Sequence, residues 1–302
     1  MKIFKGKAFF FKSIFLYIFL IITISIVSIK CWENPIYDLM INLTLKPETS
    51  SKTSLIIIDN KSTDTYRWPW SRALYGEIFE YLHKYTNAKV IVFDSILNTV
   101  DKNDPKGDDY LFKSVKGIPN YISGYRALKN EYENINDGLK YDKAFSDKFF
   151  AEISNLNLTN ESGTYKSLTI FPETYFRNIA HAGAVNINLD PIDGVLRESN
   201  NLILYKGNFY PSLSLKAYLL ANQTNKLTIN NKYIIVDKTG LKIPIHTDDN
   251  GDLRHNIKFY KQIYNSTYSH KAYSAIDIIN SKRLIKLGKK PIIAPSEFDN
   301  KI

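Results

Sequence analysis

Cysteine and histidine are scarce in this sequence. Cys31 is the only cysteine, so the chain cannot form an internal disulfide or a cysteine-based metal cluster. The five histidines are widely spaced and never form an H-x-x-x-H pair, which excludes a zinc protease site of the H-E-x-x-H kind. The phosphate-cradling patterns G-x-G-x-x-G and G-x-x-x-x-G-K-[ST] are missing, as is the G-x-S-x-G turn of serine hydrolases. We therefore expect no catalytic residue, no metal and no cofactor.

The composition is that of a globular protein. The 302 residues are 44% hydrophobic, 23% charged and 14% aromatic, which excludes a mostly disordered chain. The formal net charge is +10, and the first 30 residues carry five lysines and no acidic residue. The remainder has only a mild positive excess, so its charge does not indicate a nucleic-acid partner.

The first 30 residues differ from the rest of the chain. Residues 1–12 form a basic leader, and residues 13–29 contain no charged residue. This pattern predicts a transmembrane helix over 13–30, with the leader in the cytoplasm and residues 31–302 outside, as in a single-pass protein of the inner (plasma) membrane. A cleaved secretory signal is the alternative. The apolar run is longer than the core of an ordinary signal, and residues 27–31 lack an A-x-A pattern, so an uncleaved anchor is favoured.

The region after the anchor alternates between strand and helix patterns. Residues 54–58 and 89–93 are short apolar runs typical of buried strands, and apolar residues recur at helical spacing from Ser71 to Tyr85 between them. This unit has the size of a parallel crossover, so we predict an α/β fold with three layers and a mostly parallel sheet. Residues 127–169 are predicted to be an insertion with a helical patch over 141–153. Further helices are expected over 108–116, 211–221 and 273–279, and further strands over 120–124, 182–187, 202–205, 233–236, 241–245 and 256–259.

Several short motifs follow one another in a fixed order. They are Ile56-Ile57-Ile58-Asp59-Asn60-Lys61-Ser62, Arg67-Trp68-Pro69-Trp70-Ser71-Arg72, Ala88-Lys89-Val90-Ile91-Val92-Phe93-Asp94, Gly183-Ala184-Val185-Asn186, Asp190 with Asp193-Gly194-Val195-Leu196-Arg197, and Tyr210-Pro211-Ser212-Leu213. Together they resemble the extracellular sensory domain called CHASE type 2 (cyclase/histidine-kinase-associated sensory extracellular). The resemblance extends over residues 43–302, and W-P-W-x-R, D-G-V-x-R and Y-P-S-L in this order are its most specific part.

The resemblance implies the extracytoplasmic or periplasmic sensor of a bacterial-type transmembrane receptor. The output would be an adenylate or guanylate cyclase, a histidine kinase or a diguanylate cyclase. Two features depart from the family. Asn60 stands where the family often has Asp, and the chain stops at residues 298–302, where the family continues into a buried strand, membrane helices and an output domain. We expect a sensor without its output module, from a truncated gene, a split gene or a fragment.

Two carboxylates are predicted to meet at one edge of the sheet. Asp59 and Asp94 follow two strands that we expect to be neighbours, and ligands of open α/β sheets bind at the carboxyl ends of strands. Arginines could neutralise the pair or grip an anion, and Trp68 and Trp70 could stack on a ligand or wall a pocket. The ligand-binding candidates are Asp59, Ser62, Trp68, Arg72, Asp94 and Arg197. The alternative is a structural Asp–Arg network with tryptophans packed in the core.

Other motif residues are expected to be structural. Pro69 and Trp70 belong to the loop that opens a helix, and Pro211 and Ser212 begin another helix. Asp193 and Gly194 have the composition of a tight turn and lack the regular oxygen ligands of a calcium loop. Residues 248–252 are expected to be a solvated hairpin.

Three functions remain open at this stage. The favoured one is a membrane-anchored sensor that recognises an unknown small-molecule or protein signal and forms a homodimer or pairs with a split-receptor partner. The second is an envelope-anchored metal-assisted hydrolase that uses an Asp59/Asp94 crevice. The third is a non-catalytic envelope scaffold that binds proteins.

Overall fold

The computed structural model describes most of the chain, in several ranges. They are residues 15–23, 34–44, 51–128, 148–157, 165–169, 171–187, 189–190, 193–247, 252–260 and 268–302. The chain divides into two compact units. The smaller unit comprises residues 1–49 and 258–269, and the larger comprises residues 50–257 and 270–302.

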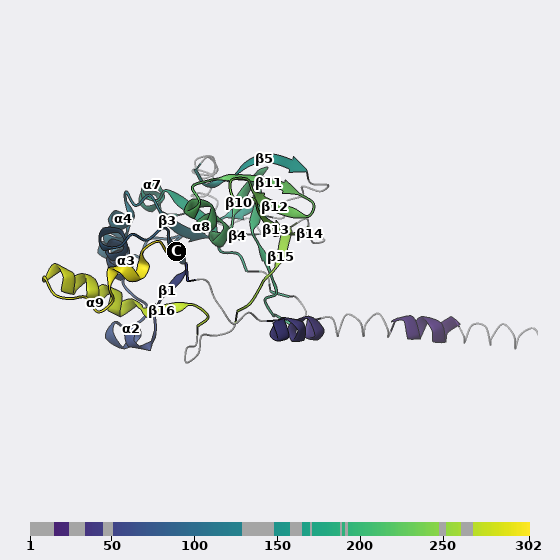
Figure 1. The fold of residues 1–302 in the computed structure, drawn as a ribbon, viewed down its shortest axis with the longest axis horizontal. Helices are drawn as coiled ribbons and strands as arrows, with labels where there is room; N and C mark the ends of the chain where they lie inside the picture. The colour runs from purple at the N-terminus through teal and green to yellow at the C-terminus, as the bar shows by residue number, and fades with distance from the viewer. Residues whose placement is uncertain are drawn as a thin grey trace, which may run out of the picture. The chain divides into compact units, whose positions relative to one another are not determined.

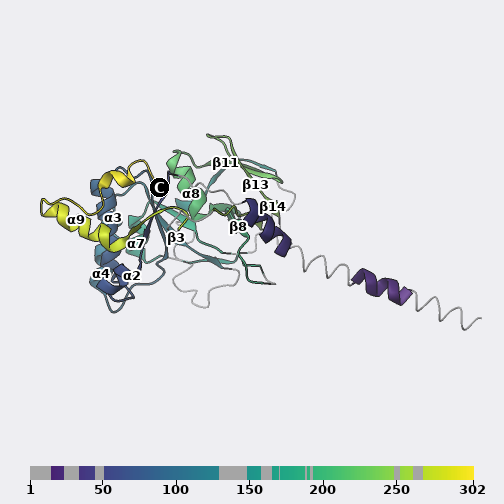
Figure 2. The same ribbon diagram turned by 60° about the horizontal axis from the view of Figure 1, so that its bottom comes forward.

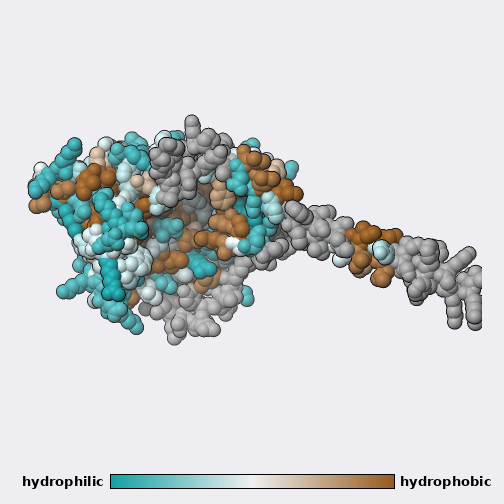
Figure 3. Space-filling view, turned by 90° about the horizontal axis from the view of Figure 1, so that it is seen from below, coloured by the Kyte–Doolittle hydropathy of each residue, from teal (hydrophilic) through white to brown (hydrophobic). Residues whose placement is uncertain are grey.

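Among the described residues of the smaller unit, residues 15–23 and 34–44 are helical. Segment 15–23 carries exposed apolar side chains such as Phe15 and Ile21, which colour it hydrophobic in Figure 3. Among the described residues, no helix is both long and apolar enough to cross a membrane. The predicted transmembrane helix over 13–30 is therefore corrected; the rest of that range lies outside the described residues.

Parallel strands form the centre of the larger unit. β1 (Ser54–Ile57) pairs in parallel with β16 (Lys271–Ser274). β2 (Ile91–Ile96), β3 (Tyr121–Tyr125) and β7 (His181–Ala184) form a second parallel sheet in that order. The predicted strands at 54–58, 89–93 and 120–124 are thus confirmed with small changes of boundary. β1 and β2 are not paired with each other, contrary to the expectation that they are neighbours.

The last residues of the chain lie between these two sheets. The Ile302 amide donates to the Lys52 carbonyl (2.8 Å), and the Ser54 amide donates to the Ile302 carbonyl (2.9 Å). On the other side, the Lys89 amide donates to the Lys301 carbonyl (2.8 Å). The C-terminus consequently lies beside the beginning of β1, as Figure 1 shows.

Helices cover both faces of the β2–β3–β7 sheet. On one face lie α3 (Arg72–Tyr85), α4 (Pro105–Val115) and α9 (Ala275–Lys286), and on the other lies α8 (Leu213–Ala221). Alternation along β3 explains this division, because Tyr121 belongs to the core with α3 while Ile122 packs with α8. Figures 1 and 2 show the same grouping.

Capping residues set where the helices begin. Ser71 accepts from the Ala73 amide and starts α3 as predicted. Asp104 accepts from the Gly107 amide (2.9 Å), so α4 begins at Pro105, three residues before the predicted start at 108. Two further short helices are α2 (Asn60–Thr65), which lies beside α9, and α7 (Glu173–Asn178), which lies beside α4. A 3₁₀ turn, η1 (Pro295–Phe298), precedes the C-terminus.

The remaining strands form small sheets that are mostly antiparallel. β11 pairs in parallel with β5 and antiparallel with β12, which pairs antiparallel with β13. The other sheets are β14–β15–β8, β9–β10 and β4–β6, all antiparallel. Their bounds are β4 Ala127–Leu128, β5 Glu152–Asn157, β6 Ser167–Leu168, β8 Glu198–Asn200, β9 Leu202–Tyr205, β10 Asn208–Pro211, β11 Lys226–Asn230, β12 Tyr233–Val236, β13 Leu241–Pro244, β14 His246–Thr247 and β15 Leu253–Asn256.

The predicted fold class therefore needs correction. The chain is α/β with mixed small sheets, not a three-layer domain with one mostly parallel sheet behind a transmembrane helix. The reason is local, because short turns such as Lys206–Gly207 join successive strands as hairpins, and a two-residue connection cannot make a parallel crossover. In the predicted insertion, 152–157 is a strand instead of the end of a helix, and residues 141–147 lie outside the described residues.

Candidate functional site

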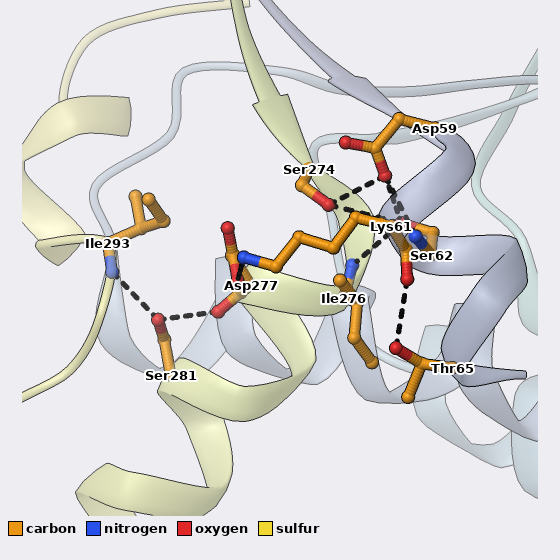
Figure 4. A network of polar contacts seen from close by, with 9 residues as sticks. All are labelled: Asp59, Lys61, Ser62, Thr65, Ser274, Ile276, Asp277, Ser281 and Ile293. Atoms are coloured by element: carbon orange, nitrogen blue, oxygen red, sulfur yellow. Dashed lines mark hydrogen bonds and ion pairs between the residues drawn. The ribbon is translucent and has the colours of Figure 1, made fainter.

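Asp59 lies where two parallel strands turn into helices. β1 and β16 pair so that Ile57 faces Ser274, and each strand leads within a few residues into a helix, α2 or α9. Asp59 is the N-cap of α2, and its Oδ1 accepts hydrogen bonds from the Ser62 amide (3.0 Å) and the Ser62 hydroxyl (2.6 Å). The Ser274 hydroxyl donates to the same oxygen (2.8 Å). We call Asp59, Ser62 and Ser274 the Asp59 junction (Figure 4).

The Asp59 junction stabilises a charged carboxylate. Burial acts to raise the pKa of Asp59, but hydrogen bonds from Ser62 and Ser274 outweigh it and lower the pKa below its ordinary value. The positive end of the α2 dipole favours the same charge. Ser62 is fully buried, and its hydroxyl oxygen also accepts from the Ile276 amide (3.2 Å). The Asp59 junction therefore links the beginning of α2 to the beginning of α9.

A second contact joins the same two helices. Lys61 forms an ion pair with Asp277 (2.5 Å) in the first turn of α9. Further along α9, the Ser281 hydroxyl donates to the Asp277 carbonyl (2.7 Å) and accepts from the Ile293 amide (2.8 Å). Figure 4 shows this series of contacts running from α2 through α9 to the segment near Ile293.

Arg72 does not lie at the Asp59 junction. Its guanidinium forms an ion pair with Asp108 (2.6 Å) and donates to the Thr99 carbonyl (2.7 Å). Asp108 is 3% exposed, and its other oxygen accepts from the Asp101 amide (2.5 Å). Arg72 thus fastens the loop after β2 to α4, which is the structural role weighed as the alternative. The sequence analysis did not identify Asp108 as the partner of Arg72. A usable signal was present, because Asp108 follows Pro105, the first residue of α4, by one helical turn.

Asp94 and Asp59 share no contact. Asp94 lies inside β2 and its side chain is exposed. Among the described residues, it makes no hydrogen bond or ion pair. Within the same residues, no group of three or more His, Cys, Asp or Glu side chains could hold a metal ion. The two carboxylates therefore do not form the crevice that their positions at strand ends suggested.

The two tryptophans of the W-P-W motif differ in environment. Trp70 is 5% exposed, donates from Nε1 to the Tyr66 carbonyl (2.9 Å), and contacts the rings of Tyr66 and Tyr75. Trp68 is 57% exposed, and Pro69 between them follows a cis peptide bond. Trp70 is therefore a core residue, and Trp68 is available at the surface.

The second arginine candidate belongs to a turn of its own. Arg197 is buried and forms a bidentate contact with Asp193, with Nη1 at 2.9 Å from Oδ1 and Nη2 at 2.8 Å from Oδ2, and Asp190 lies 3.7 Å away. Gly194 has a φ of +71°, a conformation that favours glycine, and its amide donates to the Asp190 carbonyl. The predicted tight turn is thus present, with Arg197 closing it.

The Y-P-S-L motif and the Gly183 motif meet in space. Ser212 is the N-cap of α8 and accepts from the Leu215 amide, while Pro211 ends β10. Ser212 forms a bridge with Ala184 of β7. A Cβ on Gly183 would lie 2.5 Å from the Leu213 Cα, so only glycine allows α8 to begin so close to β7. These motif residues position the beginning of α8 against β7.

One buried polar cluster was missed from the sequence. Lys282 of α9 is 1% exposed, and its ammonium contacts Glu80 (2.5 Å) and the Tyr110 hydroxyl (3.0 Å). Next to it, Arg283 pairs with Glu77 (2.9 Å). Spacing along the sequence could not have revealed these pairs, because α3 and α9 are about 200 residues apart. The cluster fixes α9 against α3 and α4.

The candidate residues thus mainly form hydrogen bonds and ion pairs that hold neighbouring elements together. Of the candidates, Trp68 and Asp94 are exposed.

Comparison with known protein families gives the decisive observation. The CHASE2 domain family matches residues 14–302, essentially the whole chain. The chain belongs to the CHASE2 family. CHASE2 is a family of extracellular sensory domains of signalling receptors, and the domain is sensory, not catalytic. No curated protein and no solved structure matches the chain. The resemblance found in the motifs is therefore confirmed. The motifs quoted for it include Asp59, Ser71 and Ser212, which cap α2, α3 and α8, and Arg197, which closes a turn.

Proposed function

We propose that this CHASE2 chain is the extracytoplasmic sensor of a bacterial-type receptor and that it itself catalyses no reaction. Its output would be a cyclase, a histidine kinase or a diguanylate cyclase. The family match over residues 14–302 carries the proposal, because it includes both the strands and the helices of the larger unit. The motif residues support it, since they hold elements together instead of forming a reaction centre.

A sensor needs two arrangements that bind the signal unequally. The contacts between α2 and α9 suit this requirement. Hydrogen bonds and ion pairs at the ends of helices can break and form again at a small cost in free energy, whereas rearranging a packed core costs much more. The Asp59 junction and the Lys61–Asp277 pair link the beginning of α2 to α9, and the loop carrying Trp68 follows α2 along the chain. We propose that a signal bound near exposed Trp68 changes the position of α9 relative to α2.

A chimeric receptor tests this function. The chain would be fused to the membrane helices and cyclase of another CHASE2 receptor, and cyclic nucleotide would be measured with cell extracts added outside. We expect Ser274→Ala to shift the basal output by several fold while the domain stays folded, because it removes a tie between α2 and α9. Asp94→Ala, which removes no contact, is the matched control. Equal output from both variants and from the parent would contradict the proposal.

Location is tested separately. A reporter that is active only outside the cytoplasm, fused after Ile302, should be active in cells. A reporter that fluoresces only in the cytoplasm, fused at the same position, should be dark. The reverse pattern would refute the extracytoplasmic placement without bearing on the ties within the domain.

The proposal for partners is a homodimer, with a split-receptor partner as the second possibility. Light scattering of the purified chain distinguishes them, since a homodimer has twice the chain mass of 34.8 kDa. A metal-assisted hydrolase receives no support from the geometry of Asp59 and Asp94. Metal-dependent turnover that disappears in Asp59→Asn would nevertheless establish that activity.

A further inference from the structure

A buried lysine without a carboxylate partner lies on the α8 side of the β2–β3–β7 sheet. Lys216 of α8 is 5% exposed, and its ammonium donates a hydrogen bond to Asn225 Oδ1 (3.0 Å). Within the described part of the chain it forms no ion pair. Lys282 of α9 is buried to a similar extent but contacts the Glu80 carboxylate (2.5 Å). Because buried charges in proteins are normally paired, the surroundings of Lys216 lack the negative charge that Lys282 has.

The strand register places His181 on the same side of the sheet as Lys216. His181 pairs with Ile122 of β3, which packs in one cluster with Leu213 of α8. Paired residues of neighbouring strands project to the same face, so the His181 side chain projects toward α8. Gly183, two residues further along β7, faces Leu213 in the same way. His181 is half-buried, so it lies nearer the surface than Lys216.

Lys148 brings a third basic group to this region. Its ammonium donates to the Phe176 carbonyl (2.7 Å) and lies over the Phe176 ring, 4.7 Å from the centroid. The segment that begins at Lys148 is joined to Lys216 through Asn225, which donates to the Phe150 carbonyl (3.0 Å). Lys148 is half-buried, as His181 is. We call Lys148, His181 and Lys216 the basic cluster.

The electrostatics of the basic cluster favour a negatively charged ligand. Burial lowers the pKa of Lys216 to about 8, and the charge of Glu152 acts against this effect. Glu152 is exposed and forms no ion pair with Lys216. Burial and the charge of Lys216, with a smaller effect from Lys148, lower the pKa of His181 to about 4. At pH 7 the cluster therefore carries a charge of about +2, from the two lysines.

We propose that the basic cluster binds a small tetrahedral oxyanion, either a free phosphate or sulfate ion or the phosphate group of a larger ligand. Lys216 would donate through the N–H groups that Asn225 does not accept, and Lys148 and His181 would contact the same ion from the half-buried side. Two lysine charges favour a dianion over acetate or chloride. The site is separate from the signal proposed near Trp68, and the inference does not depend on the receptor output.

Calorimetric titration of the full chain at low ionic strength and pH 7 tests the proposal. Inorganic phosphate should bind at about one ion per chain, and acetate should bind at least about tenfold more weakly. Glycerol 2-phosphate distinguishes the sources of the ligand, because tighter binding of this ester would identify a larger phosphorylated ligand and weaker binding would identify the free ion. Binding of phosphate should weaken as the salt concentration rises.

Nuclear magnetic resonance of the histidine rings locates the bound ion. Sulfate is the probe, since it remains a dianion over the range in which His181 titrates. Saturation with sulfate should raise the pKa of His181 from about 4 toward its ordinary value of about 6.5, because a bound anion favours the protonated ring. The pKa of His83, which is exposed on α3, should stay unchanged.

Three substitutions complete the test. Lys216→Met, which keeps the length of the side chain, should weaken phosphate binding at least about tenfold, and Lys148→Met should weaken it several fold. Lys113→Met is the matched control, because Lys113 is exposed on α4, on the opposite face of the sheet. Should Lys216→Met fail to fold, Lys148→Met and the His181 titration decide. The proposal is overturned if the parent chain binds neither ion, if Lys148→Met and Lys216→Met bind as tightly as the parent, or if sulfate leaves the His181 pKa unchanged.

Discussion

Trp68 and Trp70 are two residues apart yet differ almost completely in burial. Trp70 fills a core site with its indole N–H bonded, while most of the Trp68 surface is exposed. We predict that Trp70→Ala lowers the free energy of unfolding by about 3–5 kcal/mol, through lost burial and the cavity left behind. Trp68→Ala, the matched control, should change it by no more than about 0.5 kcal/mol. Urea denaturation of both variants measures the difference, and similar losses in the two would show that Trp68 is also packed.

The charge on Asp59 makes the free energy of unfolding of the domain depend on pH. Since hydrogen bonds lower its folded pKa, its stabilising effect is present above the unfolded pKa of about 3.9 and is lost as the pH falls through the folded value. We predict that Asp59→Ala lowers the free energy of unfolding at pH 7 by about 1 kcal/mol, the usual contribution of an N-cap. The loss should shrink below about pH 4, where the parent chain also loses the charge.

The comparison for this prediction is Asp94→Ala, measured by the same denaturation at pH 7 and pH 3. Its side chain is exposed, so its substitution should have little effect at either pH. A loss for Asp59→Ala that stays constant with pH would mean that the carboxylate charge contributes nothing.

At the scale of elements, the packing of α9 on α3 depends on a buried cation. Lys282 is almost fully buried and pairs with Glu80, whose own side chain keeps some exposure. Removing Lys282 leaves the Glu80 carboxylate with only the more exposed contact from Lys84. We predict that Lys282→Ala lowers the free energy of unfolding by about 3 kcal/mol. Lys84→Ala removes the more exposed contact to Glu80 and should lower the free energy of unfolding by less than about 1 kcal/mol.

The approach of α8 to β7 depends on Gly183. A methyl group there would meet backbone atoms of Leu213, which cannot rotate away as a side chain can. We predict that Gly183→Ala lowers the free energy of unfolding by about 1–3 kcal/mol through overpacking. At Gly207 nothing lies within reach of a Cβ, so Gly207→Ala should show only the smaller cost of its positive φ. The melting temperatures of the two variants give the comparison. Equal decreases in melting temperature would contradict the close approach of α8 to β7 at Gly183.

For the whole molecule, the half-buried His181 predicts sensitivity to mild acid. Burial, together with the positive charges of Lys216 and Lys148, lowers the pKa of His181 to about 4, and a hydrogen bond to the Pro119 backbone acts against this effect. The unfolded chain, with an ordinary value near 6.5, therefore binds the proton more readily. We predict that the free energy of unfolding rises with pH between about 4 and 6.5 and that His181→Gln flattens this rise. His83→Gln, at an exposed position, should leave the slope unchanged.

The sequence was sufficient for the local elements whose signals lie close together along the chain. Ser71 and the apolar spacing that follows it predicted α3, and the apolar runs before Asp59 and Asp94 predicted β1 and β2. The ordered motifs were also sufficient for the CHASE2 family. An expectation based on a long apolar run alone, the helix over 13–30, was wrong, as was one large parallel sheet.

What only the tertiary structure decided is which of these residues meet. Asp59 was expected beside Asp94 and instead contacts Ser274, while Arg72 contacts Asp108. The partners of Lys282 come from helices far away along the chain, and residues 300–302 separate two strands that looked like neighbours. The physical reason is range: caps and periodicity are set by residues within a turn or two, whereas strand order and ion pairs depend on how distant elements bury their apolar faces together.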